Sequence, residues 1–223
     1  MEVMFNKQLH EFKELKMIPL LNVGYDGLNP AYLRRRDTDV LSLLEREGLT
    51  TFTFDGLKRR LGFHQETLSR ILARLEEEGV VEKEPNGYRV KPKISRLKLT
   101  PIHSEVESVP LLQTYIPSNN QAQRLVANLR GKWFGLLRWF GLSESSEGVT
   151  LKWVTEDGGI QINALISDSI LTIEAKFLRE NNLDVALNAS YQLMGHISTI
   201  CSGSASVKHV GFFGGSDTFL MPA

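Results

Sequence analysis

Residues 57–81 read LKRRLGFHQETLSRILARLEEEGVV and decide the fold of the segment around them. Four apolar residues in this stretch recur with the period of one helical face: Leu68, Ile71, Leu72 and Leu75. This stripe predicts a helix over about 65–78 that buries one face and ends at Gly79. Only Gly62-Phe63-His64 separate it from a shorter helix over 55–61, so the chain must turn sharply between the two helices.

The flanking residues extend this pattern in both directions. A helix is predicted from Asp37 or Thr38 to Gly48, followed by a brief strand within Thr50–Phe54. After the 65–78 helix, two strands over 80–83 and 88–90 are joined by Glu84-Pro85-Asn86-Gly87, in which Asn-Gly is a strong hairpin signal. Helices set at a steep angle and followed by a hairpin form a winged helix-turn-helix, whose second helix fits the major groove of duplex DNA.

The stretch from Asp39 to Val90 resembles the winged-helix domains of MarR-like and related archaeal and bacterial transcription regulators. The residues that carry the resemblance are the quoted stretch 57–81 and the wing NGYRV at 86–90. The resemblance covers the N-terminal half only, and it implies that the 65–78 helix enters the major groove while the hairpin tip touches the minor groove or the backbone. Carried over by position, it places Gln65, Glu66, Ser69, Arg70 and Arg74 at the groove and Asn86 and Arg89 on the wing. His64 stands at the N-cap, where such domains often have Ser.

Basic residues flank this expected groove face, as contacts with DNA phosphates require. The full predicted DNA-binding set is Arg34, Arg35, Arg36, Lys58, Arg59, His64, Gln65, Glu66, Ser69, Arg70, Arg74, Asn86, Arg89 and Lys91. Two alternatives remain open for its arginines. Arg70 and Arg74 can instead pair with Glu66, Glu77 and Glu78 on a solvated helix face. The run 34–36 can be an ordinary charge run ahead of a helix.

The C-terminal half predicts a second layer of structure and makes the chain α+β. We expect a helix over Gln121–Phe140, a three-stranded antiparallel meander, a helix over Leu183–Ile200 and a last strand over Val207–Phe213. The expected domains are an arm (1–33), the winged helix (34–96), an extended linker with three prolines (97–119) and an α+β domain for dimerisation or ligand sensing (120–223).

Within the predicted helix 121–140, Gly131-x-x-x-Gly135 is surrounded by Trp133, Phe134, Trp139 and Phe140. Small residues one turn apart let another helix approach closely, and the aromatic side chains supply apolar area. This segment is interpreted as core within the domain, or as a dimer interface or a pocket for an apolar effector.

Composition agrees with a soluble protein that contacts DNA with one part only. The formal net charge is zero, but residues 31–98 carry +4 and residues 99–223 carry −3. Cys201 is the single cysteine, and no apolar run is long enough for a signal peptide or a membrane span, so a cytoplasmic location is expected. His196, Cys201 and His209 lack the close spacing of a metal site, and no cofactor is predicted.

These observations favour a homodimeric regulator that binds specific sequences in double-stranded DNA, because one recognition helix reads only a few base pairs. A small-molecule effector is a further possible partner, and no membrane is involved. The alternative is a winged-helix module for protein interaction in a larger transcription or replication assembly. An enzyme is not expected, since no catalytic motif occurs in the sequence.

Overall fold

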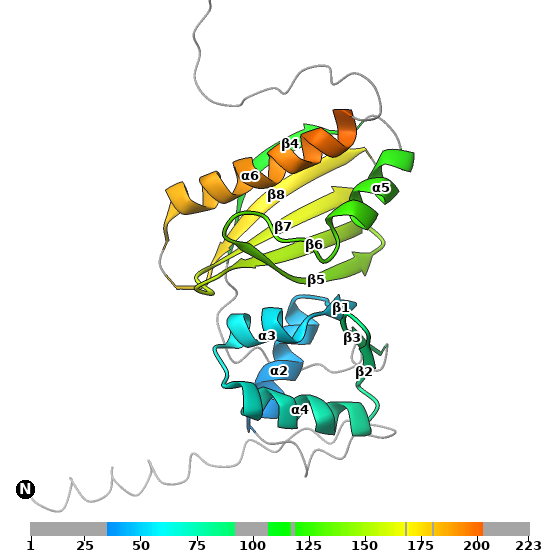
Figure 1. Cartoon of the computed structure of the whole chain (residues 1–223), viewed down its shortest axis with the longest axis vertical. Helices are drawn as coiled ribbons and strands as arrows, with labels where there is room; N and C mark the ends of the chain where they lie inside the picture. The colour runs from blue at the N-terminus through cyan, green and yellow to red at the C-terminus, as the bar shows by residue number, and fades with distance from the viewer. Residues whose placement is uncertain (1–34, 92–106, 117–118, 168, 180, 203–223) are drawn as a thin grey trace, which may run out of the picture. The chain divides into compact units, whose positions relative to one another are not determined.

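The computed structural model describes residues 35–91, 107–116, 119–167, 169–179 and 181–202 (Figure 1). These residues include nearly all of the predicted winged helix and most of the expected α+β domain. The expected arm (1–33) and the expected strand 207–213 lie outside them, as do Arg34 and His209.

The N-terminal elements form a winged helix-turn-helix, as the sequence predicts. They are α2 (Arg35–Arg46), β1 (Thr51–Phe52), α3 (Phe54–Leu61), α4 (Gln65–Glu77), β2 (Val81–Glu84) and β3 (Gly87–Val90). The predicted stripe of α4 is buried, and Leu68 is fully inaccessible to solvent. Val40, Leu41 and Leu57 complete this small core from the other two helices.

Local sequence explains the turn between α3 and α4. The side chain of Thr53 caps α3 by accepting a hydrogen bond from the backbone N–H of Gly56 at 3.2 Å. Gly62 ends α3 with a φ of 67°, a left-handed conformation in which a side chain would be strained. His64 is the N-cap of α4, and its side chain makes no capping hydrogen bond. The helix that faces DNA in the prediction therefore begins without the cap that Ser would supply.

The C-terminal elements form an antiparallel sheet covered by helices on one face (Figure 1). They are β4 (Ser108–Tyr115), α5 (Asn119–Leu129), β5 (Leu137–Ser145), β6 (Gly148–Thr155), β7 (Ile160–Ser167), β8 (Ile170–Phe177) and α6 (Leu183–Ser202). Apolar side chains that alternate along the strands, such as Trp153, Ile162 and Ile173, pack beneath α5 and α6. The α+β class is confirmed.

The predicted helix over 121–140 is wrong in its second half. The helix α5 ends at Leu129, Gly131 and Gly135 both adopt positive φ, and β5 begins at Leu137. The spacing of the apolar residues imitated a helix because β5 has a bulge between Trp139 and Gly141 that breaks strand alternation. The meander therefore has four strands, β5 to β8, and the two glycines do not form a helical contact face.

Residues 108–115, inside the stretch expected to be a linker, are extended as predicted, but they form β4. This strand pairs with β8 along its length, from Ser108 opposite Lys176 to Tyr115 opposite Ile170. Three prolines and few helix formers indicated extended chain without revealing a partner strand, because the partner is about 60 residues away in the sequence.

The two sets of strands join into one sheet of eight in the described part of the chain, in the order β2-β3-β1-β5-β6-β7-β8-β4. The junction is the short pairing of β1 with β5, in which Phe52 lies opposite Gly141. A Cβ at Gly141 would lie 2.3 Å from the carbonyl oxygen of Thr51, so only glycine permits this approach. The helices α5 and α6 leave the other face of β6 to β8 uncovered. This face carries Lys152, Gln161 and Lys176, and all three side chains contact Glu47, the residue after α2.

Candidate nucleic-acid interface

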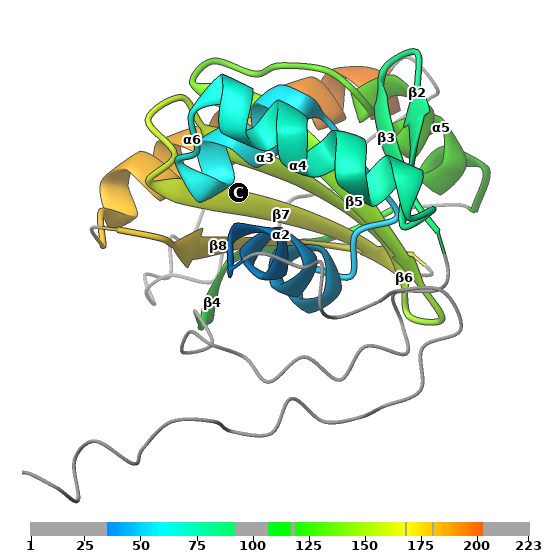
Figure 2. The ribbon, with the colours of Figure 1, turned by 90° about the horizontal axis from the view of Figure 1, so that it is seen from below.

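The exposed side of α4 is the face that the buried stripe leaves outside. Gln65, Glu66, Ser69 and Arg70 are all exposed on its N-terminal half. Figure 2, which views the molecule from below, shows α4 nearest to the viewer with the hairpin β2–β3 beside it. Polar side chains on a protruding helix, next to a protruding hairpin, are the geometry with which winged helices contact DNA.

Arg70 forms an ion pair within this face. Its Nη2 lies 2.5 Å from Oε1 of Glu66, one turn earlier in α4, and both side chains are about two-thirds exposed. The pair is the alternative that the sequence left open for Arg70. Because water surrounds both groups, the pair is weak and Arg70 can exchange Glu66 for a phosphate or a base at little cost.

Arg74 is engaged differently, with a residue that sequence spacing did not suggest. Its guanidinium donates two hydrogen bonds to Asp37 of α2, one of them from Nε at 3.3 Å. Asp37 is 1% exposed, whereas the side chain of Arg74 is 33% exposed. A two-point contact with a buried carboxylate holds α2 to α4, so Arg74 has a structural contact that Arg70 lacks.

Carboxylates also accompany the two predicted cations of the wing. Arg89 Nε lies 2.5 Å from Oε1 of Glu84, and Lys91 Nζ lies 3.8 Å from Oε2 of Glu82. Asn86 is exposed in the turn between the strands. The wing therefore presents a neutral polar tip rather than a basic one.

Four further predicted residues within the described part of the chain lie on α2 and α3. Arg35 and Arg36 are exposed at the start of α2. Lys58 pairs with Asp55 at 3.8 Å, and Arg59, one position on, is half-buried. No ion pair is recorded for Arg35, Arg36 or Arg59 with any other described residue, so these three cations are available to an external anion.

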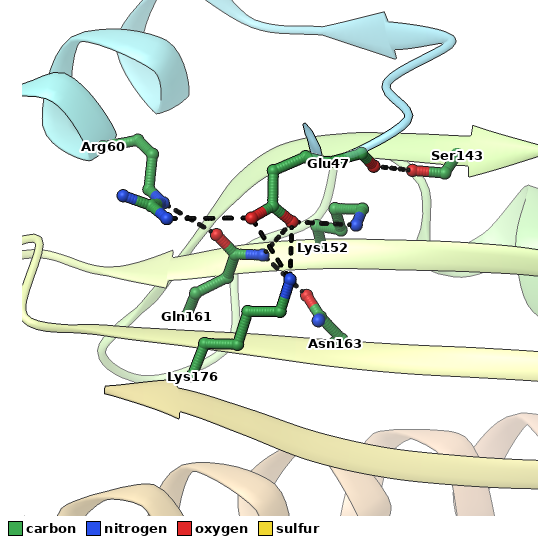
Figure 3. A network of polar contacts seen from close by, with 7 residues as sticks. All are labelled: Glu47, Arg60, Ser143, Lys152, Gln161, Asn163 and Lys176. Carbon is green, nitrogen blue, oxygen red and sulfur yellow. Dashed lines mark hydrogen bonds and ion pairs between the residues drawn. The ribbon is translucent and has the colours of Figure 1, made fainter. Parts of the chain in front are cut away.

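Sequence reasoning did not find the polar cluster that centres on Glu47, the residue that follows α2 (Figure 3). Its Oε2 accepts hydrogen bonds from Gln161 at 2.8 Å and from Lys152 at 3.1 Å. Lys176 Nζ lies 3.2 Å from both carboxylate oxygens, and Arg60 Nη2 lies 3.7 Å from Oε1. We call Glu47, Arg60, Lys152, Gln161 and Lys176 the Glu47 cluster; it links the winged helix to the uncovered sheet face.

Burial and charge oppose each other at Glu47. Burial alone would raise its pKa, but Lys152, Lys176, the hydrogen bond from Gln161 and Arg60 together lower the pKa from 4.5 to about 2. The same burial lowers the pKa of Lys152, and Glu47 counteracts that change. Glu47 is therefore ionised at neutral pH, and the cluster places three cations around its single negative charge.

No local sequence signal marks the Glu47 cluster. Gln161 alternates with Ile160 and Ile162 along β7, a pattern typical of a strand with one face in water. The structure instead buries Gln161 fully. Contacts between distant segments place Glu47 over this face, among them the pairing of β1 with β5 and the hydrogen bond that Ser143 Oγ donates to the backbone carbonyl of Glu47 at 2.7 Å.

Metal ligands and membrane-spanning helices were both sought among the described residues. No three His, Cys, Asp or Glu side chains there gather closely enough to hold a metal ion. Among the helices described, none has the length and apolar character needed to cross a membrane.

Comparison with known proteins supports the winged helix. The sequence of residues 26–88 matches the model of the MarR family. The matched segment contains the whole of α2, β1, α3, α4 and β2. A search of curated proteins found no match. Residues 26–88 are thus similar to the MarR family, and those of them that the structure describes, 35–88, belong to the winged helix-turn-helix.

Proposed function

We propose that this protein is a transcription regulator that binds specific sequences of double-stranded DNA as a homodimer. The observation that carries the proposal is the exposed N-terminal half of α4, where Gln65 and Arg70 stand on a helix that packs its other face into a core. Arginine reads guanine and glutamine reads adenine through paired hydrogen bonds in the major groove. The MarR-family match over residues 26–88 supports the same use of this helix.

The contacts divide by role. Gln65, Glu66 and Arg70 face the bases, and Glu66 can accept a hydrogen bond from a cytosine amino group once Arg70 leaves it. Ser69 and His64 are assigned to the phosphates, together with Arg34, Arg35, Arg36, Lys58, Arg59, Asn86, Arg89 and Lys91. Arg74 is expected to contribute less to DNA binding than Arg70, because its guanidinium is hydrogen-bonded to Asp37.

Internal ion pairs limit the affinity of a single copy. Arg70, Arg89 and Lys91 must each exchange a carboxylate of this chain for DNA. Two copies on a pseudo-palindromic site double the number of phosphate contacts, and this is the reason for proposing a homodimer. In this proposal, the expected domain 34–96 binds DNA. The expected domain 120–223 forms the dimer and senses an effector.

The test is selection of genomic fragments bound by the full chain, followed by titration of the enriched duplex at several salt concentrations. One enriched motif with two half-sites is the expected result. Arg70→Ala should weaken binding and relax the base preference, and Arg35→Ala should reduce the salt dependence, whereas Arg124→Ala, an exposed arginine on α5, should do neither. An unchanged affinity in Arg70→Ala, or no enriched motif, would contradict the proposal.

One observation favours a second candidate, a module for protein interaction. The C-terminal end of α4 exposes Glu76, Glu77 and Glu78 in a row, and negative charge repels DNA phosphates. Such a module would bind DNA weakly and without sequence preference, and a basic partner protein would contact these glutamates. The fragment selection separates the two candidates, because only the regulator enriches a motif.

A further inference from the structure

A cavity of about 530 Å³ opens between the wing and the segment that connects α5 to β5. Its walls come from β1, α3 and the hairpin turn on one side and from the end of α5 on the other. A volume of this size is within the range that holds small organic ligands. Of its lining residues, Arg59 and Asn86 are also among the DNA contacts proposed above, whereas Tyr88, Arg130, Lys132 and Trp133 are not.

Three cations line this cavity: Arg59 of α3, and Arg130 and Lys132 after α5. Within the described part of the chain, no carboxylate is recorded within ion-pair distance of any of them. The cavity also includes Asp55 and Glu84, but each of these acids pairs with a cation, Lys58 at 3.8 Å and Arg89 at 2.5 Å. The lining therefore has an excess of positive charge that no described side chain neutralises.

Aromatic side chains supply flat surfaces in the same cavity. Trp133 is 61% exposed, a large fraction for so large an apolar ring, and the guanidinium carbon of Arg138 lies 5.0 Å from the ring centroid. Tyr88 is stacked on Phe52 with centroids 5.4 Å apart, and Trp139 closes the wall. Rings with one open face stack well on planar heterocycles.

We propose that this cavity binds a nucleotide, with the phosphate at Arg59, Arg130 and Lys132 and the base against Trp133 or Tyr88. Three cations suit a doubly charged phosphate better than a single carboxylate, which one arginine satisfies. The cavity volume accommodates a base, a ribose and one phosphate together, so the probe of choice is adenosine monophosphate.

The site has a regulatory consequence that rests on the proposed function. The hairpin turn forms part of the cavity wall, so a bound phosphate adds negative charge beside the wing. Negative charge there opposes the approach of DNA phosphates, and the nucleotide is expected to weaken binding of the selected duplex. By reciprocity, the duplex then weakens binding of the nucleotide by the same factor.

The experiment is calorimetric titration of the full chain with adenosine monophosphate in the absence of DNA, with tryptophan fluorescence as a second readout. We expect saturable binding with one site per chain. Arg130→Gln, Lys132→Gln and Trp133→Ala should each weaken it about tenfold. These side chains are exposed, so the variants should fold, which circular dichroism checks. Arg124→Gln, on the same helix as the cavity wall but outside it, should bind like the parent.

Adenosine and inorganic phosphate distinguish the ligand class. Each should bind at least about tenfold more weakly than the nucleotide, because each fills half of the site. Benzoate that binds as tightly as the nucleotide, a titration without saturation, or equal weakening in Arg124→Gln would overturn the proposal. The nucleotide titration contains no DNA, and the fragment selection contains no nucleotide. A failure of the nucleotide proposal therefore does not affect the test of DNA binding, and the reverse also holds.

Discussion

Lys152 and Glu47 lie 105 residues apart in the sequence, yet Nζ of the lysine is 3.1 Å from Oε2 of the glutamate inside the protein. Both side chains are nearly inaccessible to solvent, at 6% and 1% exposure. The pair connects the winged helix to the sheet, so the contact between these two parts of the chain depends on a buried charge.

Replacing Glu47 with Gln should destabilise the protein. The amide keeps the shape of the side chain but leaves the charges of Lys152 and Lys176 buried without their carboxylate, which costs about 3 kcal/mol. Urea unfolding at pH 7 measures the change. Glu147→Gln, in the exposed turn between β5 and β6, is the matched control and should change stability by less than about 0.5 kcal/mol.

The same carboxylate gives stability a specific dependence on pH. The pKa of Glu47 is lowered from 4.5 to about 2 in the folded protein, so its contribution is complete above pH 4.5 and is lost as the pH falls toward 2. The loss is on the order of 3 kcal/mol. Urea midpoints measured from pH 6 to pH 3 should fall more steeply for the parent than for Glu47→Gln, and parallel curves would show that Glu47 is not the titrating group.

Substitutions of the two arginines of α4 should differ in their effects: one should lower stability and the other should lower DNA affinity. Arg74→Ala removes a two-point contact with buried Asp37 and should cost about 2 kcal/mol of stability. Arg70→Ala breaks an exposed pair and should cost less than about 0.5 kcal/mol. Arg70→Ala should nevertheless weaken binding of the selected duplex by about 1–3 kcal/mol and relax the preference at one base pair, as expected when a contact with a base is lost. Equal stability losses in the two variants would contradict this division.

Substitution of Gly141 tests the junction between β1 and β5. In Gly141→Ala the new methyl group would meet the Thr51 carbonyl at 2.3 Å, so β1 must move away from β5. Hydrogen exchange should then accelerate at the amides of Thr50 and Thr53, which donate to Leu142 and Phe140 across the junction at 2.9 Å. Gly195→Ala in α6 is the control, since no atom lies within 4 Å of its added methyl group, and a helical alanine should stabilise slightly. Unchanged exchange at both amides would show that the junction tolerates a side chain.

Much of the winged helix could be predicted because its signals are local. Leu68 and Leu75 lie on one stripe of α4, and Gly62 supplies the left-handed turn before it. The predicted hairpin also forms, but its two turn residues are Pro85 and Asn86, since Gly87 already pairs with Glu84. Each of these features depends on residues fewer than about ten positions apart. Which side chains on α4 remain exposed follows from the same stripe, and Gln65 and Arg70 could therefore be named as candidates.

The fold of residues 130–145 and the partner of Arg74 depend on contacts between segments that are distant in the sequence. The bulge after Trp139 gave β5 an apolar spacing that imitates a helix, and only its pairing with β6 and β1 makes the strand evident. Arg74 meets Asp37, rather than a glutamate one turn away, because α2 packs against α4.

The sequence alone determined that residues near 35–90 fold as a winged helix and which face of α4 remains in solvent, since helical periodicity and turn chemistry act over a few residues. The tertiary structure decided what the exposed cations of that domain touch, where Glu47 is buried, and which cavity Arg59 shares with Arg130 and Lys132. The physical reason is that charge pairing and cavity formation depend on distances across the sheet, and sequence spacing does not contain those distances.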